Sequence, residues 1–468
     1  MDARLKSLYD KFPVFLQNII LSGFSALLDR ERYGGSFKEF QTLAEKSQWY
    51  SDEQIRDYQE QKLRELVAYA YEHVPYYRKQ MQDRDLKPVD IQSLDDLKKM
   101  PILTKQDIKK NFNELLSDEY DMGSVKKGHT SGTTGTPLEV CYSDDLIHIN
   151  YAMLDRQYRW AGIELKRFGD RIAVARGNVI VPLTQKELPF WRHNYFHNHL
   201  LLSSFHMSTE NLPAYIEKLR RFKPRVLDGY PSTCYVLAKY LKNIGQTLKL
   251  DAVLTSSETL FDFQREVIEE SFECRIFDYF GAAERVIFAT ECDHHEGHHI
   301  AAEYGITEIL GPEYQPLADG ELGYLVATSL HNKAMPLIRY LTNDMTAIKA
   351  KKCSCGRGLP LMDDITTKAE DLLTLKDGRL ISPSVLTHPF KPLHTIIESQ
   401  IIQEDLDNVC VKLVVGDDYD NKEEASLIQG LQDRLGDNVN VRIEHVDQLE
   451  RTRNGKFKWV ISRVDLGI

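Results

Sequence analysis

Two glycines and several hydroxyl residues lie close together in the sequence HTSGTTGTPLEV, at residues 129–140. Gly132 and Gly135 carry no side chain, so the backbone N–H groups beside them can approach a ligand closely. The neighbouring serine and threonine hydroxyls add uncharged hydrogen-bond donors. Donors of this kind suit phosphate oxygens, so the stretch predicts a phosphate-binding loop.

This loop differs from the phosphate loop of the P-loop nucleotide hydrolases. Its glycine spacing does not match G-x-x-x-x-G-K-[ST], and Pro137 follows directly. The alternating apolar residues Leu138, Val140 and Tyr142 then predict a strand, whereas a P-loop leads into a helix. A kinase or P-loop hydrolase is therefore disfavoured. A simple polar turn between two strands remains the alternative for the loop.

Small and acidic residues follow two further expected strands. Ser257 and Glu258 come after the apolar run LDAVLT, and Gly281 and Glu284 come after CRIFDYF. In an open parallel sheet, ligands bind at the carboxyl ends of the strands. These positions are therefore candidates for one shared ligand site, although both glutamates could instead cap helices.

An aspartate and a lysine complete the set of candidate groups. Asp344, in PLIRYLTND, can accept hydrogen bonds from both hydroxyls of a ribose. Lys456, in RTRNGKFKWV, lies in a basic stretch of an otherwise acidic chain. Each has a simple structural alternative, as a turn residue and as a solvated surface charge respectively.

The composition indicates a globular protein that can bury a deep site. The chain has 468 residues and a net charge of −11, with 59 basic and 70 acidic residues. This charge opposes binding to nucleic acid or to anionic lipid, so neither is an expected partner. The longest uncharged run, residues 12–28, is too interrupted for a membrane span and predicts a packed helix. The sequence shows no cleavable signal, so we expect a cytoplasmic protein.

The pattern along most of the chain predicts an α/β fold. Residues 1–120 are charged and helical in pattern, with Asp52 as the expected N-cap of a helix that ends before Pro75. From Arg171 onward, β-rich runs alternate with helical runs. This alternation predicts parallel βαβ units and hence a mostly parallel sheet.

The last third of the chain has a different pattern. After Gly320, strands follow one another without long helices between them. Asp377 and Gly378 then give a strong two-residue hairpin signal, and a strand, a helix and a strand follow. We therefore place a domain boundary near Glu370. It separates a large multi-lobed domain at 1–370 from a small α/β domain at 371–468.

Six short motifs in chain order resemble those of one enzyme superfamily. TSGTTGTP, GYPS, SSETL, FGAAE, IRYLTND and NGK are similar to motifs of the adenylate-forming acyl ligases. Within that superfamily the chain resembles the phenylacetate–coenzyme A ligase family and its capsule-biosynthesis branch. The resemblance extends over nearly the whole chain, and six weak motifs in the same order are together specific. It implies a large adenylating domain and a small, mobile lid domain.

The resemblance implies an ATP-dependent reaction. The family joins a carboxylic acid to AMP, releases pyrophosphate, and passes the acyl group to an acceptor. The acceptor would be coenzyme A, as in the aryl-acetate enzymes, or an amine or hydroxyl in the capsule branch. ATP, Mg²⁺, a small carboxylic acid and this acceptor are therefore the expected ligands, and a homodimer is compatible with the family.

The resemblance also assigns roles to individual residues. Glu284 would hold Mg²⁺, Asp344 would hold the ribose, and Tyr230 would line the acyl pocket. Lys456 would stabilise the reacting carboxylate and α-phosphate when the small domain swings about a hinge at Glu370. The other residues expected to contact the nucleotide are Ser131, Gly132, Thr133, Thr134, Gly135, Ser257, Glu258, Phe280 and Gly281.

Three positions depart from the family pattern. Ala283 replaces a hydroxyl residue that would contact the α-phosphate, and Asn343 replaces a glycine. Lys368 replaces the arginine of the hinge and loses its bidentate geometry. The acidic groups and Lys456 are retained, so we expect a working enzyme. The alternative is a degenerate relative that binds nucleotide without turnover.

A separate set of thiols and imidazoles predicts a structural zinc site in an insert near residues 290–357. Cys292, Cys353 and Cys355 with one histidine make a Cys₃His set, which suits tetrahedral Zn²⁺. The family sequence EGLHI aligns the histidine ligand with His299, and His298 is the reserve. The chain's seven cysteines do not form the pattern of a secreted disulfide framework. A polar loop with incidental thiols is the alternative.

Overall fold

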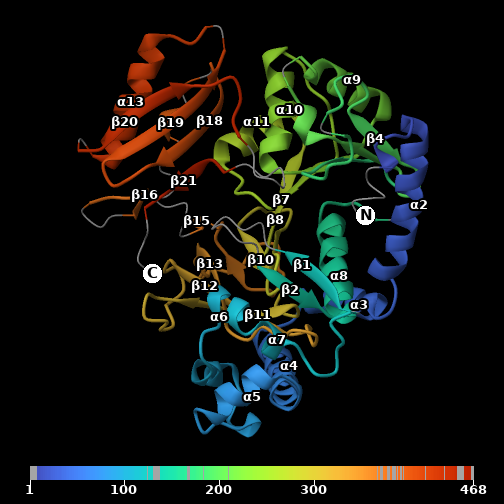
Figure 1. The fold of residues 1–468 in the computed structure, drawn as a ribbon, viewed down its shortest axis with the longest axis vertical. Helices are drawn as coiled ribbons and strands as arrows, with labels where there is room; N and C mark the ends of the chain where they lie inside the picture. The colour runs from blue at the N-terminus through green and yellow to red at the C-terminus, as the bar shows by residue number, and fades with distance from the viewer. Residues whose placement is uncertain are drawn as a thin grey trace.

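The computed structural model describes residues 8–123, 125–129, 138–165, 169–182, 184–208, 210–365, 367–368, 373–376, 380–381, 386, 388–390, 393, 395–416, 418–436, 438–450 and 458–464. They form a large body around a nine-stranded sheet and a smaller body with its own four-stranded sheet (Figure 1). Within these ranges, no helix is long and apolar enough to cross a membrane.

The central sheet is mostly parallel, as the alternation of β-rich and helical runs predicts. Its strand order is β14-β10-β9-β8-β7-β6-β3-β5-β4, and the inner strands from β8 to β5 are parallel to one another. The outer strands β4, β9, β10 and β14 pair antiparallel. The strands are β3 Ile172–Ala175, β4 Trp191–Asn194, β5 His199–Leu202, β6 Val226–Gly229, β7 Ala252–Ser256, β8 Arg275–Gly281, β9 Phe288–Glu291, β10 His298–Ile300 and β14 Leu361–Met362.

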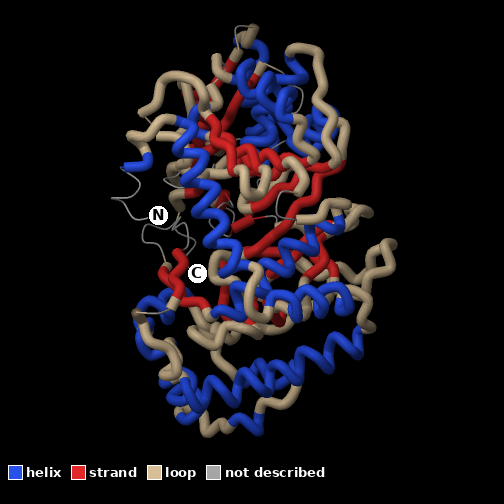
Figure 2. Tube along the Cα trace, turned by 90° about the vertical axis from the view of Figure 1, so that its right-hand side faces the viewer, coloured by secondary structure: helices blue, strands red, loops and turns tan. Residues whose placement is uncertain are grey.

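Helices cover both faces of the parallel strands, so the sheet is buried between them (Figure 2). On one face, Val226 and Ala252 pack with Tyr158 of helix α8. On the other face, Leu227 and Val253 pack against the helices α9, α10 and α11. Successive residues of a strand point to opposite faces, so continuous apolar runs are the expected sequence for these strands. The helices are α8 Asp144–Trp160, α9 Leu212–Phe222, α10 Pro231–Asn243 and α11 Asp262–Phe272.

A second sheet and a hairpin lie next to the central sheet. The second sheet is antiparallel in the order β11-β12-β13-β15, which agrees with the change of pattern along the chain. The hairpin pairs β1 with β2, and β2 is the strand predicted after the glycine-rich loop. The strands are β1 Lys126–His129, β2 Glu139–Tyr142, β11 Gly305–Leu310, β12 Gly323–Ser329, β13 Tyr340–Thr346 and β15 Thr367–Lys368.

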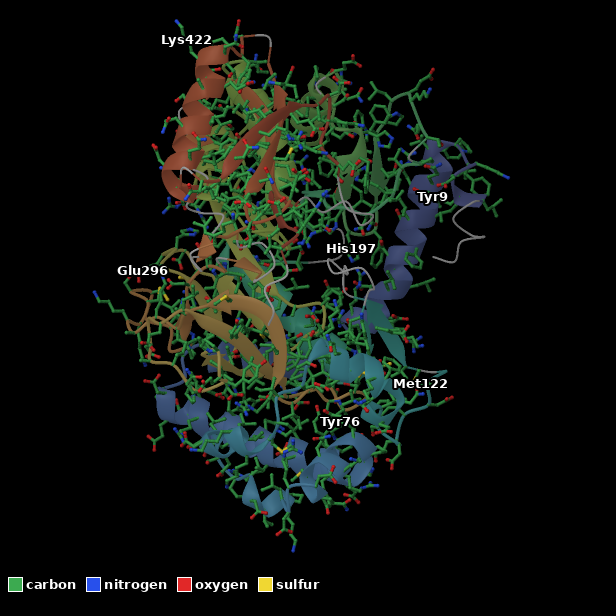
Figure 3. The ribbon with its side chains drawn as sticks, turned by 60° about the vertical axis from the view of Figure 1, so that its left-hand side comes forward. Tyr9, Tyr76, Met122, His197, Glu296 and Lys422 are labelled. Carbon is green, nitrogen blue, oxygen red and sulfur yellow. The ribbon has the colours of Figure 1, made fainter. Side chains whose placement is uncertain are left out.

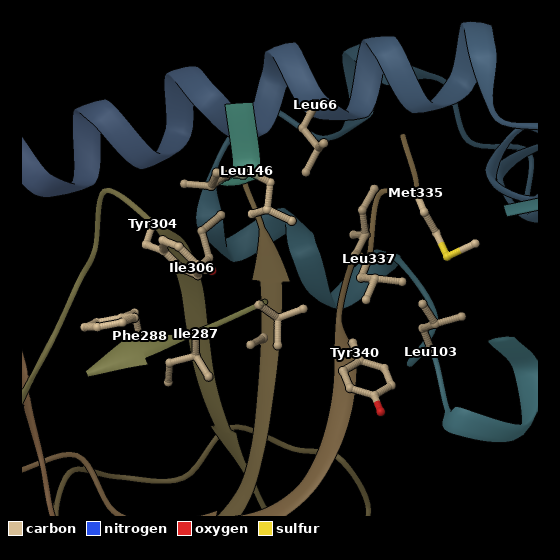
Figure 4. Close-up of a cluster of buried hydrophobic side chains, with 14 of the residues drawn as sticks. Leu66, Leu103, Leu146, Ile287, Phe288, Tyr304, Ile306, Met335, Leu337 and Tyr340 are labelled. Atoms are coloured by element: carbon tan, nitrogen blue, oxygen red, sulfur yellow. The ribbon is translucent and has the colours of Figure 1, made fainter. Parts of the chain in front are cut away.

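The helical front end packs against the second sheet through one large apolar core (Figure 4). Its longest helix, α4 (Asp52–His73), is capped by Ser51, whose side chain accepts from the backbone N–H of Gln54. The prediction of Asp52 as the N-cap was wrong by one residue, because Gln54 completes a capping box with Ser51. The other described elements of the front end are α2 Val14–Arg32, α3 Phe37–Ser47, α5 Pro75–Gln82, η1 Pro88–Asp90, η2 Leu94–Lys99, α6 Lys105–Lys110 and α7 Phe112–Leu115. The short helix η3 Ser204–His206 follows β5 of the central sheet.

The smaller body has its own sheet, in the order β20-β19-β18-β21, and its own apolar core with helix α13. The hairpin predicted around Asp377-Gly378 is present as β16 paired with β17, although the turn itself lies outside the described residues. The boundary near Glu370 also lies outside them and stays a prediction. The elements are β16 Leu373–Thr374, β17 Leu380–Ile381, η5 His388–Phe390, β18 Ile396–Gln403, β19 Asn408–Val415, α13 Asn421–Leu435, β20 Asn440–His445 and β21 Val460–Ser462.

Among the described residues, a buried lysine and a pair of aromatic rings hold the smaller body against the large one. The ammonium of Lys239, on α10, donates to the backbone carbonyl of Ile396 in β18. The ring of Phe261, before α11, lies 5.2 Å from the ring of Trp459, which precedes β21. Burial lowers the pKa of Lys239 to about 8 from its usual 10.5, and the nearby charge of Glu398 opposes part of this shift.

We expect docking of the two bodies to strengthen with pH because of Lys239. A docked lysine with a pKa near 8 holds its proton less tightly than a lysine in water, so release of the proton favours docking. The docked arrangement should therefore gain stability as pH rises from 8 towards 10, and show little change between pH 6 and 7.5. Small-angle scattering or protease cleavage near residue 370 would measure the docked fraction.

Lys239→Met should remove this pH dependence, since methionine fills similar space without a charge. Lys242→Met is the matched control, because Lys242 lies on the same helix and pairs with Glu270 in solvent. Equal pH dependence in the wild type and Lys239→Met would contradict this assignment.

Candidate functional site

The carboxyl ends of the parallel strands meet at one edge of the central sheet. Ala175 of β3 is opposite Gly229 of β6, and Gly229 is opposite Thr255 of β7. Ser256 of β7 is in turn opposite Tyr279 of β8. The residues that follow these strands therefore emerge at the same edge, where a parallel sheet binds its ligands. They include the predicted site residues Tyr230, Ser257 and Glu258, and the predicted residues Phe280 and Gly281 are the last two residues of β8.

Glu284 and Asp344 come together through a tyrosine. The hydroxyl of Tyr340, at the start of β13, donates to Oε1 of Glu284 at 2.6 Å, and all three side chains are buried. Burial raises the pKa of Tyr340, and the negative charges of Glu284 and Asp344 raise it further. In Figure 4 the Tyr340 oxygen points away from the apolar cluster that holds the ring. The negative charges of Glu284 and Asp344 therefore both act on the Tyr340 hydroxyl.

The ends of the glycine-rich loop are fixed next to this acidic pair. His129 and Glu139 are opposite one another in the β1–β2 hairpin, so the loop begins and ends at adjacent positions. The hydroxyl of Tyr142, in β2, donates to the carbonyl of Ala283 at 2.6 Å. Gly128 is required here, because a Cβ at this position would collide with the Tyr142 hydroxyl. The hairpin thus attaches the loop to the segment that carries Glu284.

The predicted residues after β6 and β7 have mixed environments. Oε2 of Glu258 accepts from the backbone N–H of Ser232 at 3.1 Å, so this carboxylate satisfies the first turn of α10, which was the simpler reading of the residue. Ser257 has a φ of 72°, in the left-handed region that few non-glycine residues occupy. Tyr230 precedes α10, and burial raises the pKa of its hydroxyl.

A buried ion pair between Arg176 and Asp228 lies at the same edge. Arg176 follows β3, and its Nε donates to Oδ1 of Asp228 at 2.9 Å. Its Nη1 donates to the hydroxyl of Ser256 at 3.1 Å, and the Tyr158 hydroxyl donates to Oδ2 of Asp228 at 2.8 Å. The Arg176 side chain is still 23% exposed. A guanidinium held by its neighbours and still accessible is able to bind a polar group of a ligand.

The four predicted zinc ligands converge. Cys292, His299, Cys353 and Cys355 offer ligand atoms that all lie within 4.8 Å of one another. Sγ of Cys292 lies 3.6 Å from Sγ of Cys353, and Sγ of Cys355 lies 3.5 Å from Nε2 of His299. Two thiolates on one Zn²⁺ at bonds of about 2.3 Å are about 3.8 Å apart in a tetrahedron. The distances therefore fit a shared ion and are too long for disulfides.

The surroundings of these four groups also suit a metal. The backbone N–H groups of His294 and Arg357 each point at a cysteine sulfur at 3.4 Å, which stabilises thiolates. Burial lowers the pKa of His299 to about 4, so the imidazole is neutral at physiological pH and has a free lone pair for a metal. The guanidinium of Arg357 lies 4.3 Å from the Trp160 ring beside the cluster. The residues present fit a closed Zn²⁺ site.

His298, the reserve ligand, belongs to a neighbouring group of charges. Its Nε2 lies 3.2 Å from Oδ2 of Asp278, and its Nδ1 lies 3.1 Å from Oδ1 of Asp364. Burial alone would lower its pKa, but the two carboxylates raise it to about 10. Arg265 pairs with Glu291 at 2.7 Å in the same region. His298 is therefore occupied by carboxylates, whereas His299 faces the thiols.

Part of the predicted site lies outside the described residues. This holds for Lys456, the hinge residue Glu370 and the loop residues Ser131, Gly132, Thr133, Thr134 and Gly135. Their roles stay predictions.

Three side chains at the site were missed by the sequence analysis: Tyr142, Arg176 and Tyr340. Tyr340 lies four residues before Asp344 in one strand, so the period of two could have placed both on one face. Arg176 directly follows a predicted strand, which is the same signal that identified Tyr230. For Tyr142, the sequence contains no signal of its contact with Ala283.

Comparison with known proteins agrees with this geometry. A family described as the CapK C-terminal domain matches residues 373–463. The chain is 27% identical to protein CapK of Staphylococcus aureus, over 98% of this chain and 100% of that protein. It is 30% identical to the phenylacetate–coenzyme A ligase of Escherichia coli K12, over 72% of this chain and 76% of that protein.

Solved structures show the same fold. A 2-hydroxyisobutyryl-CoA ligase in its postadenylation state, in complex with R3-HIB-AMP, has a TM-score of 0.67 at 17% identity, over 90% of this chain and 91% of that one. The same ligase in its thioesterification state has a TM-score of 0.54 at 18% identity, over 88% of this chain and 91% of that one. From the order of its motifs, its sequence relatives and its fold, the chain belongs to the phenylacetate–coenzyme A ligase family of adenylate-forming, AMP-producing ligases.

Proposed function

We propose that the protein activates a small carboxylic acid with ATP, forms an acyl-adenylate, and transfers the acyl group to an acceptor. The observation that carries this proposal is the meeting of three chain segments at the Tyr340–Glu284 hydrogen bond. One segment follows β8, the second is β13 with Asp344, and the third is the hairpin that holds the glycine-rich loop. Relatives named as phenylacetate–coenzyme A ligases support the same reading.

In this proposal different residues of the site bind the phosphates, the ribose and the Mg²⁺ of ATP. Residues 131–135 bind the outer phosphates through backbone N–H groups and hydroxyls, and Asp344 accepts from the ribose hydroxyls. Glu284 is the residue that would hold Mg²⁺, which supplies positive charge against the phosphates. Tyr340 orients Glu284 by donating to one oxygen, and leaves the other oxygen of the carboxylate for the metal.

Lys456 is proposed to stabilise the transition state from the small domain. As the acid attacks the α-phosphate, negative charge shifts between the carboxylate and the phosphate, and a fixed ammonium offsets it without transferring a proton. The arrangement of the two bodies supports this role. The TM-score is higher with the 2-hydroxyisobutyryl-CoA ligase in its postadenylation state (0.67) than with the same enzyme in its thioesterification state (0.54).

The Arg176–Asp228 pair supports a polar acid as the substrate. The guanidinium lies at the strand edge with Tyr230 and Ser256, where an acyl group attached to AMP would sit. Asp228 already neutralises the guanidinium charge, but an acid with a purely apolar tail would cover the exposed part of this side chain without giving it a further acceptor, which costs binding energy. We therefore propose that the acid carries a hydroxyl, an amide or a second carboxylate near the end of its carbon chain.

The acceptor is proposed from the relatives. The relatives named as phenylacetate–coenzyme A ligases support coenzyme A as the acceptor. The match of residues 373–463 to the CapK C-terminal domain supports instead an acceptor of the capsule branch, which would be an amine or a hydroxyl. Release of AMP on addition of coenzyme A, compared with a panel of amino and hydroxyl compounds, separates the two. The zinc site is proposed to be structural, because its four protein ligands leave no open position for a substrate.

The activity predicts acid-dependent exchange of labelled pyrophosphate into ATP. Lys456→Ala should abolish it, and Glu284→Gln should lower it by about 10²-fold or more, since each removes a charge at the phosphates. Tyr340→Phe should lower it by about tenfold and raise the Mg²⁺ concentration needed for half-maximal exchange.

Tyr324→Phe, in the neighbouring strand β12, is the matched control and should leave exchange unchanged. Absence of exchange with a broad panel of acids, or equal exchange in the Lys456→Ala variant, would support the degenerate, nucleotide-binding relative instead.

The substrate proposal predicts the order of acids in that panel. Hydroxy acids and dicarboxylic acids should exceed phenylacetate in kcat/KM. Arg176→Met should lower kcat/KM for the best polar acid by about 10²-fold while leaving the KM for ATP unchanged. Arg225→Met is the control, because Arg225 lies before β6, at the opposite end of that strand, and pairs with Asp251. Preference for phenylacetate that Arg176→Met does not alter would refute the proposal.

The metal proposal predicts one zinc per chain by elemental analysis. Cys353→Ser and Cys355→Ser should lose the zinc and lower the melting temperature by about 5 °C or more, because metal binding contributes to folding. Cys410→Ser, at a buried thiol of the smaller body, should retain it. Zinc-free protein with unchanged stability in all three variants would leave the four groups as incidental neighbours.

A further inference from the structure

The connection from β3 to β4 runs along the edge of the central sheet that carries the candidate site. β3 ends at Ala175, and β4 begins at Trp191, which is opposite Leu202, the last residue of β5. Since β5 is parallel to β3, this end of β4 lies at the carboxyl edge of the parallel strands. The described residues 176–182 and 184–190, named here the β3–β4 loop, therefore lie at the edge where a parallel sheet binds its ligands.

The first residues of the β3–β4 loop already belong to the candidate site. Arg176 donates to Asp228 and to Ser256. Burial raises the pKa of Tyr230, and a hydrogen bond with the backbone N–H of Gly177 opposes part of this rise. The loop therefore touches the side chain that is predicted to line the acyl pocket. An acid bound beside Tyr230 would contact the same loop.

A buried arginine fixes the far end of the β3–β4 loop. Arg192, in β4, is only 1% exposed. Its Nη2 donates to Oε1 of Gln185 at 2.9 Å, and its Nη1 donates to the backbone carbonyl of Pro189 at 2.9 Å. The side-chain amide of Gln185 also donates to the carbonyl of Pro189, at 3.0 Å. Gln185 and Pro189 both belong to the loop, so the guanidinium holds this end of it in one conformation.

The start of helix α2 holds the same arginine and the same loop. Nε of Arg192 donates to Oε1 of Gln17, and the amide of Gln17 donates to the backbone carbonyl of Tyr9 at 3.1 Å. The Tyr9 hydroxyl in turn donates to the carbonyl of Ile180, in the β3–β4 loop, at 2.9 Å. Tyr9 lies beside the start of α2 (Figure 3). Gln17 and Tyr9 are both buried, so water does not readily replace these bonds.

These buried bonds make the position of the loop depend on α2. Removing an acceptor from a buried guanidinium leaves a charged donor without a partner, which costs more than losing an exposed hydrogen bond. Arg192, Gln17 and the loop therefore share one fixed arrangement. The bonded carbonyl of Ile180 follows Gly177 closely in the chain, so it limits how far this part of the loop can move away from Tyr230.

We infer that Arg192 and Gln17 are positioning residues, which hold the β3–β4 loop against Tyr230 and so limit the size of the acid that the site accepts. This role rests on the proposed acid activation. Neither residue belongs to the groups proposed to contact the reacting atoms, so both act through the loop. The proposed ATP ligands Glu284 and Asp344 follow β8 and lie in β13, outside this network, so the effect should be confined to the acid.

Gln17→Met tests this role, because methionine fills similar space but cannot donate to Tyr9 or accept well from Arg192. In the pyrophosphate exchange assay it should raise the KM for the best acid by about tenfold, while kcat and the KM for ATP change by less than about twofold. It should also raise the kcat/KM of longer acids relative to that best acid, since a loosened loop leaves more room for them.

Gln59→Met is the matched control. Gln59 is also buried, and its amide donates to the backbone carbonyls of Ala302 and Gly305, both at 3.0 Å. The same substitution there should lower the melting temperature to a similar degree, because it too leaves buried carbonyls unpaired. The KM for the acid should stay at its wild-type value, which separates a role in positioning from a general loss of stability.

A milder variant and a measurement without turnover complete the test. Tyr9→Phe removes only the bond to Ile180 and should raise the KM for the acid by about threefold. Amide hydrogen exchange at residues 176–182 should be faster in Gln17→Met and unchanged in Gln59→Met.

Two results would overturn the inference: an acid KM that Gln17→Met and Tyr9→Phe leave unaltered, or one that Gln59→Met raises as much. A wild type that shows no pyrophosphate exchange with any acid would instead remove the proposed function, and the selection of acids with it. Faster amide exchange in Gln17→Met alone would in that case still support the hold of α2 on the loop.

Discussion

The hydrogen bond from the Tyr340 hydroxyl to the Glu284 carboxylate joins the two sheets at the candidate site. Glu284 follows β8 of the central sheet, and Tyr340 begins β13 of the second sheet. A buried bond of 2.6 Å from a phenol to a carboxyl oxygen is short, so it fixes the Glu284 side chain in one direction. Because burial and nearby negative charge raise the pKa of Tyr340, the phenol keeps its proton and remains a donor. The acidic groups are thereby placed before any ligand arrives.

Apolar packing and backbone pairing hold Tyr340 in the position that this bond needs. The backbone N–H of Leu103 donates to Arg339, and that of Leu341 donates to Leu103, so the chain is fixed on both sides of the tyrosine. The ring lies in the same core as Leu103 and Leu337, while its oxygen leaves that core (Figure 4). The helical front end, which supplies Leu103, therefore supports the site without contributing a reactive group to it.

The sequence predicts what depends on local pattern and misses what depends on distant contacts. The alternation of β-rich and helical runs is enough to predict a parallel sheet, and hence that Tyr230, Ser257 and Phe280 emerge at one edge. The three cysteines and one histidine of the zinc set follow from residue types, and the choice of His299 over His298 follows from the family resemblance. The contact of Tyr142 with Ala283 joins positions 141 residues apart, and nothing near either residue signals it. For the same reason the apolar run at 12–28 predicts a helix, but not that Asn18 and Ser22 of this helix would accept from the backbone N–H groups of His193 and Tyr195 at the edge strand β4.

The arrangement around β10 shows how one strand serves two electrostatic environments. His298 and His299 are neighbours, so they point to opposite faces of the sheet. His298 enters a group of carboxylates and is charged, whereas burial keeps His299 neutral beside the thiols. His298 and Arg265 pair with Asp278, Asp364 and Glu291, so two positive charges offset part of the negative charge of three carboxylates. An ion held by the four ligands would then connect the region of β9 and β10 to the segment before β14, and would support β8 from the side opposite to its parallel neighbours.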